Sequence, residues 1–93
     1  MLLRAKVLNM IQITKHAVKR YQERIMQCSD LEAELRILHA MSYGILLSQK
    51  GKHKAIQHGK AVLIVYELEK NINIVKTVEK IDFTGFWNKE KRG

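Results

Sequence analysis

The length and composition of the chain indicate one folded domain with an anionic partner. Its 93 residues suit a single domain spanning 1–93 and are too few for two ordinary ones. Hydrophobic residues make up 46% of the chain, which excludes a disordered protein. The formal net charge of +8 favours nucleic acid. Charge alone does not separate RNA from DNA, an acidic protein or a membrane surface.

Cysteine usage and apolar segments predict a cytoplasmic protein without membrane contact. Cys28 is the single cysteine, so no intramolecular disulfide can form, and a reducing compartment fits best. Arg4 and Lys6 interrupt the apolar N-terminus, which lacks the features of a signal peptide. No apolar run approaches the ~20 residues that span a bilayer. We also expect no metal and no cofactor, because no phosphate-binding glycine loop or metal-ligand cluster is present.

Two helices are predicted in the first half of the chain, after residues 1–12, which fit either a short strand or a helix lead-in. The first helix runs from about 15 to 26 behind Thr14, a good N-cap residue. The second runs from about 30 to 42, where Ser29 and Glu32 have capping-box spacing and Gly44 is expected to end the helix in a left-handed conformation. The expected buried faces comprise Ala17, Val18, Tyr21 and Ile25 in the first helix, and Leu31, Leu35, Leu38 and Met41, helped by Ile37, in the second.

The second half of the chain predicts strands. Short apolar segments at 45–47 and 53–57 flank a turn at 50–52, and a β-branched run at 61–68 forms a hairpin with 72–78. Aromatic residues of the tail are expected to anchor it to the body, whereas residues 88–93 are expected to fray; the aromatics are Phe83, Phe86 and Trp87. The order predicts an α+β fold with two N-terminal helices on one face of a small antiparallel sheet.

His16, Arg20 and Arg24 are the candidate catalytic residues. They lie four residues apart, so they form one row along the first helix. Guanidinium groups bind phosphate with paired donors, and imidazole transfers protons near neutral pH. The alternatives are a solvated face, or arginines paired with acids of the second helix. Glu23 is expected to pair with a Lys or Arg rather than to act in catalysis.

A lysine-rich segment is the candidate nucleic-acid-binding region. Residues 44–60 contain no acid, and we expect their cations to hold phosphates flanking the reaction site; these are Lys50, Lys52, His53, Lys54, His58 and Lys60. His53 and His58 are five apart, where a strand places side chains on opposite faces, which disfavours a metal site. Tyr66 and Trp87 are able to stack on bases, but a packing role is favoured for each.

The segment from Ile13 to Ile25 resembles the opening of a family of small phage and mobile-element proteins. Its His-Ala, Arg and Glu-Arg positions match at His16, Arg20, Glu23 and Arg24, and the resemblance extends over about 13–79. Those domains look similar to the RelE and BrnT toxins, many of which cleave RNA without metal. The chain departs from the family in its first dozen residues and in its basic aromatic tail.

The resemblance implies a metal-independent ribonuclease toxin with an acidic antitoxin as a possible partner. In such a reaction a base removes the 2′-hydroxyl proton, the oxygen attacks phosphorus, and cations stabilise the phosphoryl oxygens. His16 would be the base or acid, and Arg20 and Arg24 would bind the scissile phosphate. Two alternatives remain open: a non-catalytic nucleic-acid-binding or regulatory module, and a protein-interaction module that docks an acidic partner.

Overall fold

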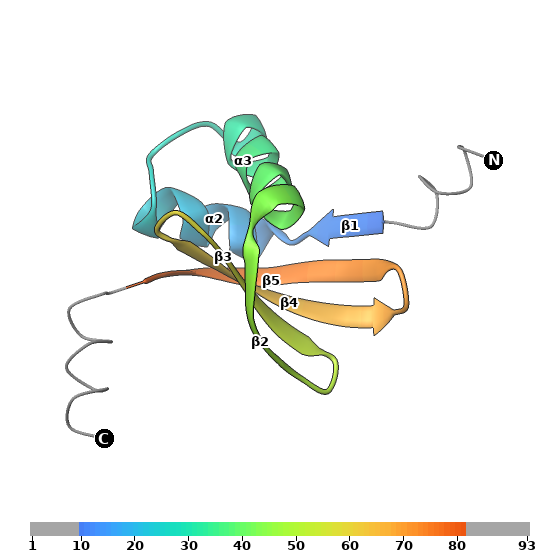
Figure 1. The fold of residues 1–93 in the computed structure, drawn as a ribbon. Coiled ribbons are helices and arrows are strands. Elements are labelled where there is room, and N and C mark those ends of the chain that lie inside the picture. The colour runs from blue at the N-terminus through green and yellow to red at the C-terminus, as the bar shows by residue number, and fades with distance from the viewer. Residues whose placement is uncertain (1–9, 82–93) are drawn as a thin grey trace, which may run out of the picture.

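The computed structural model describes residues 10–81 as a five-stranded sheet with two helices packed on one face (Figure 1). The elements are β1 (Met10–Ile13), α2 (Lys15–Arg24), α3 (Asp30–Tyr43), β2 (Ile45–Lys50), β3 (His53–His58), β4 (Ala61–Glu69) and β5 (Ile72–Lys80). The predicted α+β layout with helices on one face is confirmed. The expectations for the aromatic tail and for residues 88–93 lie outside the described residues.

The sheet is mixed, so the expectation of a purely antiparallel sheet is wrong at one edge. The strand order is β1-β5-β4-β3-β2, with β1 parallel to β5 and every other pair antiparallel. Strands joined by a hairpin must run antiparallel, whereas β1 is separated from β5 by both helices and three strands. Residues 10–13, which suited a strand or a helix lead-in, therefore form the edge strand β1.

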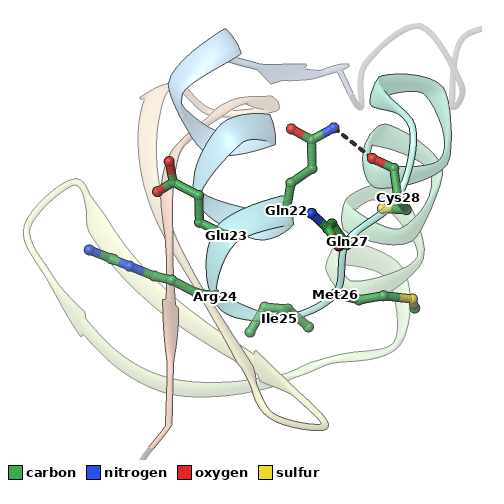
Figure 2. A pocket seen from close by; sticks show the side chains of 7 residues that line it. All are labelled: Gln22, Glu23, Arg24, Ile25, Met26, Gln27 and Cys28. Carbon is green, nitrogen blue, oxygen red and sulfur yellow. Dashed lines mark hydrogen bonds between the residues drawn. The ribbon is translucent and has the colours of Figure 1, made fainter.

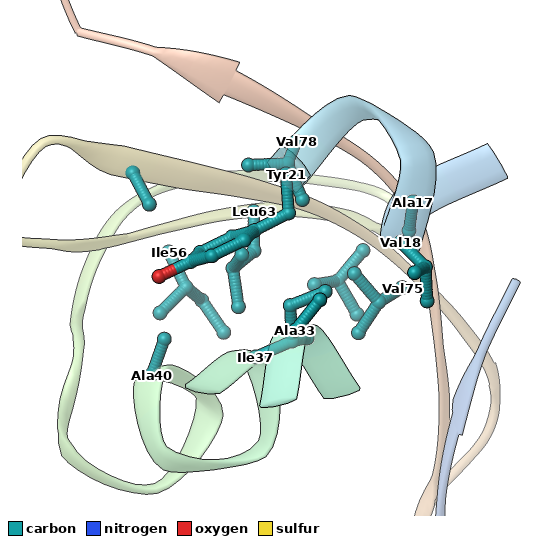
Figure 3. Close-up of a cluster of buried hydrophobic side chains, with 12 residues drawn as sticks. Ala17, Val18, Tyr21, Ala33, Ile37, Ala40, Ile56, Leu63, Val75 and Val78 are labelled. Atoms are coloured by element: carbon teal, nitrogen blue, oxygen red, sulfur yellow. The ribbon is translucent and has the colours of Figure 1, made fainter. Parts of the chain in front are cut away.

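Thr14 caps α2 and fastens it to β5. Its hydroxyl oxygen accepts from the Ala17 N–H at 3.0 Å, which confirms the predicted cap. The same hydroxyl is positioned to donate to the carbonyls of Val75 and Lys76, at 3.2 and 3.1 Å. The helix ends at Arg24, two residues before the predicted end. Its predicted inner face is correct: Ala17, Val18 and Tyr21 are buried (Figure 3). Ile25 is partly buried and packs against the same core.

The inner face of α3 is not the predicted one. The cap is correct, because the Ser29 hydroxyl accepts from the Glu32 N–H at 3.1 Å. Of the predicted residues only Ile37 is fully buried, and it shares its face with Ala33 and Ala40. The predicted core leucines point to solvent, with Leu31 66%, Leu35 56% and Leu38 37% exposed, and Met41 is half-buried.

Gly44 allows the chain to pack closely against its neighbours, and its conformation is not left-handed. Its φ and ψ are −77° and 171°, so the predicted left-handed conformation is wrong. A Cβ at this position would lie 2.5 Å from the Ala40 carbonyl oxygen, 2.6 Å from Ile56 Cγ2 and 2.8 Å from the Gln57 carbonyl oxygen. Only glycine lets the chain pass from α3 into β2 this close to β3.

The central strands β4 and β5 supply most of the sheet's contribution to the core. Leu63, Val75 and Val78 are fully buried beneath the helices (Figure 3), and Val65 is fully buried as well. Alternation along a strand turns the intervening side chains to the opposite face, which no described helix or strand covers. Within residues 10–81 one face of the sheet is therefore left open, and we call it the open face.

Candidate nucleic-acid interface

His16 and Arg20 lie side by side on the outer surface of α2. Arg20 Nε donates to His16 Nε2 at 3.4 Å, and its Nη1 forms an ion pair with Glu23 Oε1 at 2.8 Å. The expectation that Glu23 pairs with a basic residue is confirmed. The three groups form one linked set at the solvent-facing surface of the helix.

Arg24, at the end of α2, forms its contacts with β5 and not with His16 or Arg20. Its Nη1 donates to the Val78 carbonyl at 3.1 Å and forms an ion pair with Glu79 Oε1 at 2.7 Å. The acids of α3 therefore do not bind it, contrary to one alternative drawn from the sequence. Arg24 fastens the helix to the edge of β5, and its side chain keeps 35% exposure. A catalytic role for His16, Arg20 and Arg24 stays a prediction.

A depression beside the end of α2 is lined by residues 22–28 (Figure 2). Gln22 Nε2 donates to the Cys28 carbonyl at 2.9 Å and to Asp30 Oδ1 at 2.8 Å, which closes the loop between the helices. The Cys28 side chain is half-buried against the core. Figure 2 shows Glu23 and Arg24 extending to one side, away from Cys28. The depression brings together no set of acid, base and cation.

The lysine-rich segment is a hairpin, and its cations are divided between the two ends. Lys50 and His53 are register partners beside the β2–β3 turn, whereas His58 and Lys60 lie at the other end of β3. Five residue steps along a strand span about 16 Å, so these groups do not form one cluster. Lys52 Nζ is 3.4 Å from the Leu68 carbonyl oxygen, which places it at the first end.

Lys54 and His58 face the helix side of the sheet, away from Lys50 and His53. Lys54 is the register partner of the buried Val65 and forms a 3.8 Å ion pair with Glu67, and its side chain is 18% exposed. It is therefore unavailable as a free phosphate ligand. The predicted set of six is thus split by strand alternation as well as by strand length.

On the open sheet face Lys50 and His53 lie near Tyr66, for which the sequence favoured a packing role, and near Lys76, which the sequence did not single out. Tyr66 is the register partner of His53, and their ring centroids are 5.1 Å apart. Lys76 Nζ lies 5.9 Å from the Tyr66 ring centroid. Lys76 falls at a register irregularity of β5, between the pairs Val65–Val75 and Ile64–Thr77. We call Lys50, His53, Tyr66 and Lys76 the cationic band.

The start of α2 lies next to the backbone of Lys76, one member of the cationic band. Thr14, two residues before His16, lies within hydrogen-bonding distance of the Lys76 carbonyl. Beyond Val75 the outer edge of β5 has no strand partner among residues 10–81, and α2 lies beside it. The structure does not bring the predicted catalytic pair and the lysine-rich region into one cluster, because α2 packs on the helix face of the sheet whereas Lys50 and His53 lie on the open face.

A second group of aromatic and charged side chains lies between α3 and β3. The rings of His39 and Tyr43 are 4.6 Å apart, and those of His39 and His58 are 5.0 Å apart. Burial raises the pKa of the nearby Tyr21 hydroxyl above 10.0, an effect that the Arg36 guanidinium opposes. The spacing of His39 and Tyr43 marks them as neighbours on a helix. Their contact with His58 depends on how α3 crosses the sheet.

Comparisons with known proteins add no family to this description. No family model matches the chain, and no curated protein or solved structure does. Within residues 10–81 no helix is both long and apolar enough to cross a bilayer. The same residues bring together no group of three side chains suited to hold a metal ion. Fold and site together define a small basic α+β protein with an open, cationic sheet face.

Proposed function

We propose that this protein binds single-stranded RNA on the open face of its sheet. The observation that carries the proposal is Tyr66, set between the His53 ring and the Lys76 ammonium group. Unpaired bases stack on aromatic rings, and adjacent cations hold the backbone phosphates. A half-buried tyrosine on an uncovered sheet face offers its ring surface together with flanking positive charge.

The local charges support the same interpretation. Glu67 is paired with Lys54 on the helix side, and Glu79 is paired with Arg24 at the edge of β5. No ion pair within residues 10–81 involves Lys50 or Lys76. Their charges are therefore available to phosphates, each of which releases counterions when it is bound.

Binding to a fluorescent single-stranded RNA tests the proposal. Stacking contributes about 1–3 kcal/mol per base, so Tyr66→Ser should weaken binding about 5- to 150-fold, while Tyr66→Phe keeps the ring and most of the affinity. Tyr43→Ser is the matched control, because Tyr43 is 70% exposed on α3, away from the open face. Equal affinities for the Tyr66→Ser and Tyr43→Ser proteins would contradict the proposal.

Two lysine variants distinguish a specific phosphate contact from the general effect of positive charge on RNA binding. Lys76→Met should lower the slope of log K against log salt by about 0.7, the value for one phosphate of a single strand. Lys19→Met removes the same charge from the exposed surface of α2 and should leave this slope nearly unchanged. Salt-sensitive binding to an acidic protein, with indifference to RNA, would favour the protein-interaction alternative instead.

Metal-independent RNA cleavage is the second candidate function, favoured by the contact between His16 and Arg20 on the outer surface of α2. His16 would take the 2′-hydroxyl proton, the 2′-oxygen would bond to phosphorus, and the 5′-oxygen would leave with a proton from an acid. Arg20 would turn from His16 to the phosphoryl oxygens and stabilise their charge. The resemblance to RelE- and BrnT-type toxins implies the same reaction and an arrangement of this kind.

Incubation of RNA in EDTA tests cleavage directly. The wild-type protein should produce fragments ending in 2′,3′-cyclic phosphate, and His16→Asn and Arg20→Met should abolish them while RNA binding persists. Lys19→Met serves again as the control. Intact RNA with full binding would leave the RNA-binding function and refute cleavage, whereas unchanged cleavage in both variants would remove this pair as the site.

A further inference from the structure

The solvent-facing side of α3 carries a stripe of leucines. Leu31, Leu35 and Leu38 are 66%, 56% and 37% exposed, and Ser42 continues the row; we call these four residues the leucine stripe. On a helical projection the stripe lies opposite the buried side chains of α3. Of nine large hydrophobic side chains exposed within residues 10–81, seven lie between 31 and 47. Exposed apolar surface concentrated in this way marks an interaction site.

The spacing of the stripe suits a helical partner. Its members follow one another at intervals of four, three and four, which is the repeat of the seam in a coiled coil. The helix has 14 residues and is about 21 Å long, so it offers two heptads of seam. A second helix can therefore cover the whole stripe.

Charges beside the stripe exclude RNA as its occupant. Asp30, Glu32 and Glu34 lie in the first half of α3, and the one arginine of the helix, Arg36, is bound to Glu32 at 2.9 Å. This surface is acidic in a chain whose formal net charge is +8. A phosphate backbone would be repelled there, so the stripe is separate from the cationic band in both chemistry and position.

We propose that the leucine stripe binds the leucine stripe of a second copy of this chain, with the two α3 helices antiparallel. In this arrangement Leu35 lies opposite Leu38 of the partner subunit, and Leu31 lies opposite Ser42 of the partner subunit. The flanking positions bring Glu32 to His39 of the partner subunit, an acid opposite a base. A two-fold axis makes the contact self-complementary.

The acids of α3 decide the orientation. A parallel pair would gather the acidic first halves of the two helices at the same end, and like charges close together oppose association. The antiparallel pair sets these acids against the second half of the other helix, which carries no acid after Glu34. The dimer leaves the open sheet face of each copy available, and it does not depend on RNA binding.

Sedimentation of the full chain tests the dimer. We expect the mass of a dimer for the wild type and of a monomer for Leu35→Glu, with the same circular dichroism. Leu68→Glu is the matched control, since Leu68 is 43% exposed at the end of β4 and should not affect the dimer. Should Leu35→Glu fail to fold, Leu31→Lys replaces it. A monomeric wild type at the highest soluble concentration overturns the proposal.

Thiol crosslinking tests the orientation. In a Cys28→Ser background, a chain with Leu31→Cys should crosslink efficiently to a chain with Ser42→Cys, and poorly to its own kind. Efficient crosslinking of the Leu31→Cys chain to itself would show a parallel pair and overturn the proposed arrangement. Crosslinking in neither mixture, with a dimer by mass, would show that another surface forms the dimer and would equally overturn it.

Discussion

Replacing Gly44 distinguishes close packing from left-handed helix termination. A left-handed position after a helix accepts asparagine. The backbone of Gly44 is instead extended, so a larger residue is opposed there by lack of space and not by the backbone conformation. In the structure a Cβ at Gly44 meets the carbonyl oxygens of Ala40 and Gln57 at 2.5 and 2.8 Å, together with Ile56 Cγ2. Two of these three atoms belong to the backbone and cannot rotate away. We therefore expect Gly44→Ala and Gly44→Asn to be similarly destabilising.

The magnitude follows from the cost of overpacking. Inserting one carbon into a filled site costs about 1–3 kcal/mol, and backbone neighbours place Gly44 near the upper value. At about 3 kcal/mol the melting temperature should fall by about 12–24 °C for a domain of this size. Urea unfolding should show a lower midpoint with an unchanged slope, because the surface exposed on unfolding is the same.

Gly51 is the control for this experiment. Its φ is +60°, and a Cβ added there would meet nothing within 4 Å, so Gly51→Asn should change the free energy of unfolding by less than about 1 kcal/mol. A Gly44→Asn protein as stable as the wild type, with Gly44→Ala destabilised, would refute the packing argument and restore a left-handed helix end.

Three further predictions concern the helices and their contacts with the sheet. Ile37→Ala should lower the free energy of unfolding by about 2–5 kcal/mol, because Ile37 is fully buried. Leu35→Ala should change it by less than about 0.5 kcal/mol in dilute protein, because Leu35 is exposed. If urea unfolding showed Leu35→Ala to be the less stable of the two variants, the observed inner face of α3 would be contradicted. Thr14→Ala removes the cap of α2 and its contacts to β5 and should cost about 1–2 kcal/mol, whereas Thr14→Ser should restore most of it. Burial raises the pKa of the Tyr21 hydroxyl and Arg36 opposes the rise, so the neutral hydroxyl stabilises the fold fully below pH 10.0, and this contribution is lost as pH rises through the raised pKa. Arg36→Met should raise the Tyr21 pKa further in a spectroscopic titration, and a lower pKa would contradict this assignment.

Local signals in the sequence predict the elements that depend on a few neighbouring residues. Thr14 and Ser29 begin helices because each side chain reaches an N–H group three residues ahead. The run from Ala61 to Leu68 forms a central strand because its β-branched side chains suit a sheet buried on one face. These outcomes require no knowledge of where the rest of the chain lies.

Local signals do not predict which face of α3 is buried. The helix carries two apolar stripes, one of leucines and one built from Ala33, Ile37 and Ala40. Hydrophobicity alone favours the leucines, but in the folded protein the face that carries Ala33, Ile37 and Ala40 packs against the rest of the core. The prediction for Gly44 is wrong for a related reason, because its neighbours Ile56 and Gln57 are distant in sequence.

The candidate site is only partly predictable for the same physical reason. His16 and Arg20 meet because a helix places residues four apart together. Tyr66, His53 and Lys76 meet through strand register and a β5 irregularity, neither of which a linear spacing reveals. Residues 50–60 look like one basic region in the sequence, yet pleating sends alternate side chains to opposite faces.

Thr14 has a consequence for the order in which the chain assembles. The Thr14 hydroxyl caps the first turn of α2 and lies within hydrogen-bonding distance of carbonyl groups 61 and 62 residues away in β5. The strand partner of β1 is also β5, so β1 cannot join the sheet before β5 has formed. During synthesis, the segment that leaves the ribosome early must wait for one that leaves late. Contacts between such distant segments slow folding, so docking of β1 onto β5 should be a late step. Removing the hydrogen bonds of Thr14 should therefore speed unfolding more than it slows refolding.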